Sequence, residues 1–306
     1  MGNERIIRTF ILAVIGLAAF ALWRPNSPDP TEDVRSRETR FFITKAHQDR
    51  RFDAVIYGDS RGLRGLSPAV IGDQVPGLRI YNFSWNAGGM NRDMYAEAEK
   101  LLDPASQSPA LILVPTALSF MSFKRSNSQF NEYRHKPWDQ VMLYRHLPRV
   151  ADWFQPVSPS VYPRKVLDIR PYRELVQVFH PDGWIETDQT PLDDLAEMTV
   201  HEERLEGNSV DPELIRDFMA QTADWTARGI RVFACFLPAH PPRVTLEDSI
   251  LGFDKDAFRA DFARSGGIWL DLPQTGFESY DGSHLTASSA RRVSALLGEA
   301  LASEMR

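Results

Sequence analysis

The chain has 306 residues, of which 43% are hydrophobic and 25% charged, so it can bury a large core and is not a disordered protein. Its formal net charge of −6 argues against general binding to nucleic acid. A single cysteine, Cys235, excludes an intrachain disulfide, and no Cys/His cluster or other motif indicates a metal or a cofactor.

The first 24 residues are expected to form a transmembrane anchor. Arg5 and Arg8 precede the uncharged apolar stretch Phe10–Trp23. Counted from Ile6, the segment has 18 residues, or about 27 Å of helix, with Arg8 reaching to the interface. Positive charge before the span places the short N-terminus in the cytoplasm, and the rest of the chain on the periplasmic or extracellular side of the cytoplasmic membrane. A cleaved signal peptide, with a cleavage site at Ala19-Phe20-Ala21, is the alternative.

Residues 25–51 are expected to be a linker or stalk, and residues 52–306 one domain. Continuous apolar runs predict five buried parallel strands at Ala54–Tyr57, Leu78–Phe83, Ala110–Pro115, Ile230–Leu237 and Ile268–Leu272. Helices are predicted from Pro68, over Arg92–Leu102, over 211–228, largely over Leu246–Arg264, and over Thr286–Glu304. The pattern predicts a three-layer α/β/α fold with a five-stranded parallel sheet.

Between about residues 118 and 210 the hydrophobic period breaks down, and no strand there looks buried. The stretch is too long for a plain loop. We expect an insertion over the carboxyl ends of the strands, acting as a lid or an acceptor-binding surface. Ordinary helices and loops packed on one side are the alternative.

A serine follows the first strand, in Gly58-Asp59-Ser60. The turn from a strand into a helix at this end of a parallel sheet is where open α/β proteins place their ligands. A serine hydroxyl is a weak nucleophile that needs a base. The best candidate is His284 in the loop before the last helix, because Asp281, three residues earlier, can reach its Nδ1 and leave Nε2 to accept the serine proton. The alternative interpretations are a helix-capping serine for Ser60, a helix-capping or turn aspartate for Asp281, and a helix-capping or surface histidine for His284.

These motifs, with a glycine after the second strand, resemble the SGNH (GDSL-type) hydrolase superfamily. The resemblance covers the order of elements from about residue 52 to 304, apart from the insertion, and implies a flavodoxin-like fold. It implies that Ser60 attacks an ester carbonyl, with His284 as general base and Asp281 orienting it. It also implies an oxyanion hole made by the backbone N–H of Ser60, that of Gly88 or Gly89, and one side chain.

The superfamily's side-chain donor, an asparagine after the third strand, is missing here. The chain reads Val114-Pro115-Thr116-Ala117-Leu118-Ser119 at that place. Thr116 or Ser119 are candidate replacements, and Asn86 is another, reaching in from the loop after the second strand. Because losing one such donor typically costs about 3 kcal/mol, or roughly 100-fold in rate, the departure argues against efficient general esterase activity.

The layout is similar to that of divergent, membrane-anchored members of the superfamily, the alginate O-acetyltransferase group and the D-alanyl transfer protein of teichoic acids. This resemblance implies an enzyme acting on O-acyl groups, expected to be acetyl, of an envelope polysaccharide, with transfer favoured over hydrolysis. The implied partners are an acyl donor, a glycan acceptor and a multi-spanning membrane acyltransferase. His240, between prolines after the fourth strand, is expected to contact substrate, and a plain loop histidine is the alternative.

A second hypothesis belongs to another class. The missing asparagine is also consistent with a catalytically weak, membrane-tethered scaffold or polysaccharide-binding subunit that keeps the fold.

Overall fold

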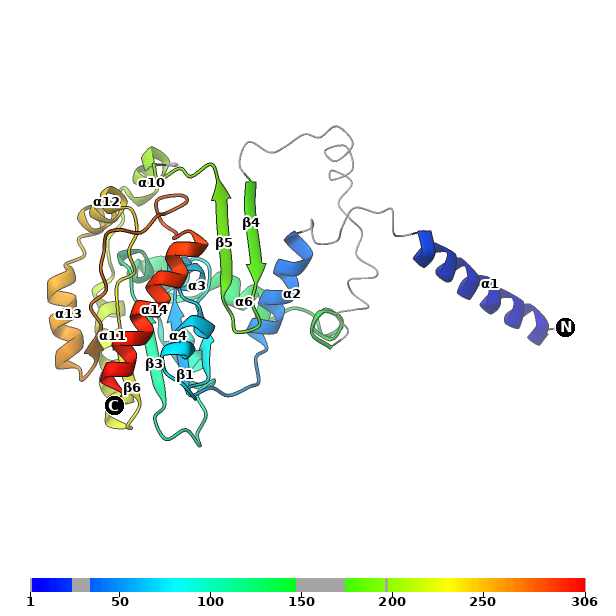
Figure 1. The fold of residues 1–306 in the computed structure, drawn as a ribbon, viewed down its shortest axis with the longest axis horizontal. Helices are drawn as coiled ribbons and strands as arrows, with labels where there is room; N and C mark the ends of the chain where they lie inside the picture. The colour runs from blue at the N-terminus through cyan, green and yellow to red at the C-terminus, as the bar shows by residue number, and fades with distance from the viewer. Residues whose placement is uncertain (1, 24–33, 147–173, 196–197, 306) are drawn as a thin grey trace.

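The computed structural model describes residues 2–23, 34–146, 174–195 and 198–305. Its central feature is a five-stranded sheet with the strand order β2-β1-β3-β6-β7, in which all neighbouring strands are parallel (Figure 1). The strands are β1 (Ala54–Gly58), β2 (Ile80–Asn82), β3 (Ala110–Val114), β6 (Arg231–Ala234) and β7 (Ile268–Trp269). Each overlaps one predicted strand, so the predicted α/β fold with a five-stranded parallel sheet is confirmed.

Both faces of the sheet are covered by helices, which gives three layers. On β1, Ala54 and Ile56 face one layer, whereas Val55 and Tyr57 face the other. The first layer holds α3 (Ser60–Gly65), α4 (Pro68–Gln74) and α14 (Ala287–Glu304), and the second holds α5 (Arg92–Glu99), α11 (Pro212–Ala227) and α13 (Lys255–Arg264). Because both faces are buried, the strands read as continuous apolar runs instead of alternating ones.

Local capping signals explain where the helices begin and end. Ser67 caps α4 and Asp211 caps α11, and in each case a proline occupies the first helical turn, as predicted. The predicted helical stretch Leu246–Arg264 is divided into α12 (Pro241–Leu251) and α13. The division occurs at Gly252, whose φ of 68° ends α12 in the left-handed conformation.

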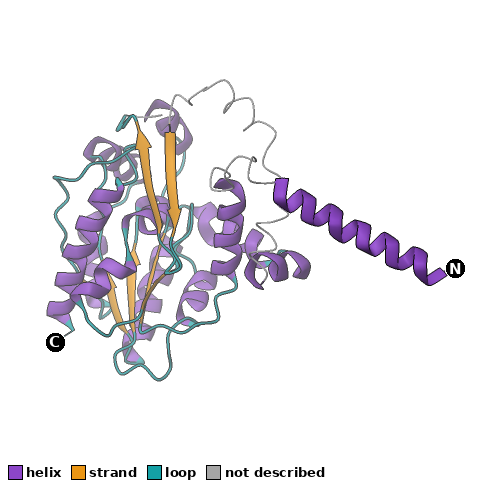
Figure 2. Ribbon diagram, turned by 45° about the vertical axis from the view of Figure 1, so that its right-hand side comes forward, coloured by secondary structure: helices purple, strands orange, loops and turns teal. Residues whose placement is uncertain are grey.

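The hairpin β4 (Glu174–Phe179) and β5 (Ile185–Thr190) lies within the predicted insertion (Figure 2). The hydrophobic pattern did not predict this hairpin. Trp184 and Ile185 are each 1% exposed where β5 begins, but β4 and the rest of β5 are largely exposed or half-buried, so neither strand is buried along its length. The other described elements of the region are η3 (Ala117–Phe120), η4 (Ser122–Arg125), α6 (Ser128–Arg134), α7 (Trp138–Val141), η5 (Met142–His146) and α10 (Met198–Leu205). Residues 147–173 lie outside the described part.

The helix α2 (Val34–Ala46) falls within the predicted stalk, but it packs against the folded domain. Phe42 and Ile43 are fully buried, and Lys45 is 1% exposed. The Lys45 Nζ donates hydrogen bonds to the carbonyls of Asn82 (2.5 Å) and Gly183 (2.8 Å). Burial lowers the pKa of Lys45 well below its usual value. The lysine thus joins α2 to the end of β2 and to the hairpin turn.

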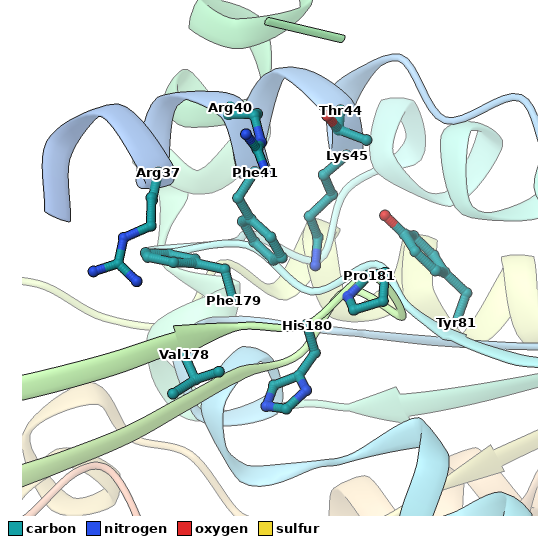
Figure 3. A pocket seen from close by; sticks show the side chains of 10 residues that line it. All are labelled: Arg37, Arg40, Phe41, Thr44, Lys45, Tyr81, Val178, Phe179, His180 and Pro181. Atoms are coloured by element: carbon teal, nitrogen blue, oxygen red, sulfur yellow. The ribbon is translucent and has the colours of Figure 1, made fainter. Parts of the chain in front are cut away.

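A cavity of about 370 Å³ lies between α2 and the end of β4 (Figure 3). Arg37, Phe41 and Lys45 contribute to it from α2, and Phe179 and His180 from the hairpin. It is a groove on the flank of the domain where α2 docks.

At the N-terminus, α1 (Gly2–Trp23) is a helix of 22 residues that projects from the rest of the chain in both views (Figures 1 and 2). Within the described ranges, no helix combines the length and the apolarity needed to cross a bilayer. The predicted transmembrane span is therefore not supported by the structure. Large apolar side chains of α1 are nevertheless exposed, namely Ile6, Ile7, Phe10, Ile11, Leu12, Val14 and Ile15.

Replacing Lys45 by Met tests the docking of α2. Met fills similar space but leaves two carbonyls without their donor, so we expect a loss of about 1–3 kcal/mol in the free energy of unfolding by urea. Lys100→Met is the matched control, because Lys100 is 62% exposed and pairs only with Glu97 in the described structure. It should change stability by less than about 0.5 kcal/mol. Equal stability of Lys45→Met and wild type would contradict this role.

Candidate active site

Ser60 is the first residue of α3 and follows directly on the end of β1. Asp59 is the helix cap, and its Oδ1 accepts a hydrogen bond from the Arg61 backbone N–H at 2.9 Å. In the strand order, β2 lies on one side of β1 and β3 on the other. The carboxyl end of β1 is therefore the point where the direction of strand addition reverses, and open α/β sheets bind ligands at such a point. Because Asp59 is the cap of α3, Ser60 is not the capping residue, and this alternative interpretation of Ser60 is removed.

The three residues of the predicted triad lie in one hydrogen-bonded chain. The Ser60 Oγ is 2.8 Å from His284 Nε2, and His284 Nδ1 is 2.7 Å from Asp281 Oδ2. The serine comes from the end of β1, and the other two residues come from the loop before α14. This is the arrangement in which a carboxylate fixes the imidazole tautomer and the free nitrogen faces a hydroxyl.

The loop that carries His284 is held in one conformation. Asp281 Oδ1 accepts the backbone N–H of Ser283 (2.9 Å) and of His284 (2.8 Å), so the same carboxylate both closes the turn and orients the ring. Gly282 has a φ of 82°, and a Cβ there would lie 2.3 Å from the Asp194 carbonyl. A glycine is required at this position for both reasons. The close approach of Asp194 also places part of the insertion against the site.

Burial and charge set the protonation of the pair. Burial alone would raise the pKa of Asp281, but the hydrogen bond and charge of His284, with two backbone N–H donors, lower it to about 2. The pKa of His284 is lowered, mainly by burial and also by Arg64 and Arg61, against the opposing effect of Asp281. At neutral pH the site therefore holds an anionic carboxylate and a neutral imidazole, the form that can accept a proton from Ser60.

Three of the predicted oxyanion donors are engaged elsewhere. The Thr116 hydroxyl donates to Asp59 Oδ2 at 2.7 Å, and the Gly88 N–H donates to the Trp85 carbonyl at 3.1 Å. The Ser119 hydroxyl donates to the Thr116 carbonyl at 2.7 Å. These contacts do not support Thr116, Ser119 or the Gly88 amide as free donors to a substrate.

Asn86 remains as a side-chain candidate. It is half-buried in the turn after β2, where its Oδ1 accepts a hydrogen bond from Arg64 Nη1 at 2.6 Å. Its turn lies against the two residues that precede the nucleophile, because a Cβ added at Gly88 would lie 2.7 Å from the Gly58 carbonyl and 3.2 Å from the Asp59 Cα. The Ser60 N–H, at the first position of α3, has no intrahelical partner by its place in the helix.

His240 lies beside the triad loop. Its backbone N–H donates to the Gly282 carbonyl at 3.0 Å, and it precedes α12 as the capping residue. Its Nδ1 is buried and has no hydrogen-bond partner within the described chain. Nearby, Arg243 Nη1 lies 3.3 Å from the Ser283 Oγ. The structure therefore brings His240 to the edge of the site, and its contact with substrate stays a prediction.

Sequence reasoning missed a buried ionic group next to the nucleophile. Arg61 donates to both carboxylate oxygens of Glu247 at 2.7 Å, and His201 Nε2 lies 2.9 Å from Glu247 Oε1. Burial would raise the pKa of Glu247, but Arg61 and His201 lower it to about 2. The pair anchors the turn after Ser60 to α12. No local signal reveals it, because the partners are 186 residues apart.

In the part of the chain that the structure describes, no group of three or more His, Cys, Asp or Glu side chains is arranged to hold a metal ion. Comparisons with protein-family models, curated proteins and solved structures found no match.

The pH dependence of ester cleavage tests the protonation of the pair. Only neutral His284 can accept the Ser60 proton, and its pKa is lowered from 6.5. We therefore expect the acid limb of kcat/KM for p-nitrophenyl acetate to have its midpoint below pH 6.5. Ser60→Ala, measured in parallel, corrects for spontaneous hydrolysis. A midpoint at pH 7 or above would contradict a buried neutral base.

Proposed function

We propose that this protein is a serine acyl-ester enzyme that acts on O-acyl groups, in the first instance acetyl, of an envelope polysaccharide. One observation carries the proposal, the hydrogen-bonded chain from Ser60 through His284 to Asp281. The lowered pKa values of both partners and the position of the serine at the carboxyl end of β1 support it. The resemblance of the motifs to SGNH hydrolases agrees with this chemistry.

The reaction divides into two acyl transfers. The Ser60 Oγ adds to the ester carbonyl while His284 Nε2 takes the hydroxyl proton, and the tetrahedral oxyanion collapses with loss of the alcohol, which receives that proton. An incoming hydroxyl, from a sugar or from water, then gives its proton to His284 and adds to the acyl-serine. Collapse of this second intermediate returns the proton to Ser60 and releases the new ester or the free acid.

Transfer to a sugar is the proposed outcome over hydrolysis. Transfer requires that an acceptor displace water from the acyl-enzyme. The long insertion beside the nucleophile favours this exclusion of water. Two residues of the insertion support it by touching the site, Asp194 against Gly282 and Trp184 through its Nε1 to the Arg64 carbonyl at 2.8 Å. Arg64 and Arg243 add positive charge beside the triad, which suits an anionic polymer.

We further propose that α1 associates the protein with the cytoplasmic membrane, with the domain on the periplasmic or extracellular side. The exposed apolar side chains of α1 and the arginines near its start support this. A multi-spanning membrane acyltransferase is the proposed source of the acyl group.

Labelling with a fluorophosphonate probe tests for an activated nucleophile. We expect one covalent adduct by intact mass on the full chain in detergent, none on Ser60→Ala, and labelling at least about 100-fold slower on His284→Ala. Ser288→Ala is the matched control, because Ser288 is an exposed serine of α14 and should leave labelling unchanged. Absence of an adduct on folded wild-type protein would favour the scaffold or polysaccharide-binding alternative.

Partition of the acyl group tests transfer against hydrolysis. With p-nitrophenyl acetate as donor, a de-esterified acidic polysaccharide should increase p-nitrophenol release and become acetylated, because a bound hydroxyl outcompetes water. Acetate and polymer-bound acetyl are quantified separately, with Ser60→Ala as control. Fast release of acetate that is independent of the polymer would show that the enzyme is a hydrolase.

A further inference from the structure

The asparagine that serves as side-chain oxyanion donor in the SGNH superfamily has no counterpart after β3 in this chain. After β3, where the superfamily supplies an asparagine, Thr116 donates its hydroxyl to Asp59. Asn86 is the one sequence-predicted side-chain donor whose donor group has no acceptor within the described residues. The orientation of its amide group decides where that donor points.

Arg64 fixes that orientation. An amide side chain presents either an oxygen or an NH₂ group to its neighbour, and an arginine can only donate hydrogen bonds. Because Arg64 Nη1 lies 2.6 Å from the Asn86 side chain, the atom that faces it is the oxygen, and the NH₂ group must point the other way. A charged donor holds this carbonyl more strongly than a neutral one does.

The two partners are themselves fixed in place. Arg64 lies four residues after Ser60 in α3, so it is on the same face of that helix. The α3 backbone is held by Asn82 Nδ2, which donates to the carbonyls of Gly62 and Leu66 at 2.9 Å each. Trp184 holds the Arg64 carbonyl from the hairpin.

The turn that carries Asn86 is held by two further contacts. The Asn86 backbone N–H donates to Gln129 Oε1 at 3.0 Å, and Lys124 Nζ donates to the Ala87 carbonyl at 2.8 Å. The close approach of Gly88 to the Gly58 carbonyl then brings this turn against the turn that presents the nucleophile.

We propose that the Asn86 Nδ2 donates to the oxyanion formed on Ser60 and that Arg64 is the positioning residue that turns the amide toward it. This inference rests on the proposed acyl-ester function. It assigns to Arg64 a role in the same site that the sequence did not indicate. The arginine acts through Asn86 and does not itself touch the reacting atoms.

A double-mutant cycle on the rate of fluorophosphonate labelling tests the proposal, because the phosphoryl oxygen of the probe develops negative charge where the oxyanion forms. We expect Asn86→Ala to slow labelling about 100-fold and Arg64→Met at least about tenfold. The double variant should be no slower than Asn86→Ala alone, since Arg64 has nothing left to position. Arg64→Lys, which keeps a cationic donor, should recover part of the loss.

Arg231→Met is the matched control, because this arginine lies at the opposite, amino end of β6 and donates to the Glu304 carbonyl. It should label at the wild-type rate. Thermal unfolding of each variant separates a lost donor from a damaged fold.

The pH profile gives a readout that a purely structural role would not move. The charges that act on His284 are Asp281, Arg64 and Arg61. Loss of Arg64 removes one that lowers its pKa, so Arg64→Met should move the acid limb to higher pH, whereas Asn86→Ala should leave the limb in place.

Each remaining outcome is decisive. Wild-type labelling of Asn86→Ala, or rate losses that multiply in the double variant, would overturn this inference while leaving the proposed function intact. Failure of the wild-type protein to label at all would remove the proposed function, and this inference with it.

Discussion

A buried carboxylate at the end of β1 determines how the nucleophile is presented. Asp59 is 5% exposed, and burial of a carboxylate is costly unless its oxygens accept hydrogen bonds. One oxygen caps α3 through the Arg61 N–H, and the other accepts the Thr116 hydroxyl from the loop after β3. A single side chain thus starts the helix and joins the carboxyl ends of two neighbouring strands. Ser60 takes its position from that junction.

The helix that begins at Ser60 has only six residues, too few to be stable by itself. Contacts from distant parts of the chain supply its stability. Asn82 binds its carbonyls from β2, Trp184 binds the Arg64 carbonyl from the hairpin, and Glu247 binds Arg61 from α12. Removing one partner of a buried ion pair typically costs about 3–5 kcal/mol, so these contacts favour a preorganised site.

The strands of the sheet and the grouping of Ser60, His284 and Asp281 could be predicted from the sequence. The strands follow from local apolar runs, and the grouping follows from where the loops lie in a parallel sheet. Apolar runs marked the strands, and the carboxyl end of a parallel sheet is a shared location for Ser60 and His284. The hairpin was not predicted, because β4 is largely exposed and only the start of β5 is buried. Long-range partners were not predicted either. Nothing near Thr116 in the sequence shows that its hydroxyl is already bonded to Asp59.

Part of the predicted stalk also proved to belong to the domain. The charged composition of α2 concealed that Phe42 and Ile43 are fully buried, and that Lys45 hydrogen-bonds two carbonyls. A lysine rarely counts as a core residue in sequence reasoning. Here it anchors the segment that connects α1 to the sheet.

The only cysteine of the chain, Cys235, directly follows β6, and its thiol can be used to follow local opening of the fold. Cys235 is fully buried among the side chains that pack under α14, and burial raises the pKa of its thiol to about 12. A thiol in that state does not react with alkylating reagents until the surrounding structure opens. The rate at which an added reagent modifies the native protein therefore reports the opening of the central sheet at one known place. The chain carries its own reporter of breathing motions, with no engineered label.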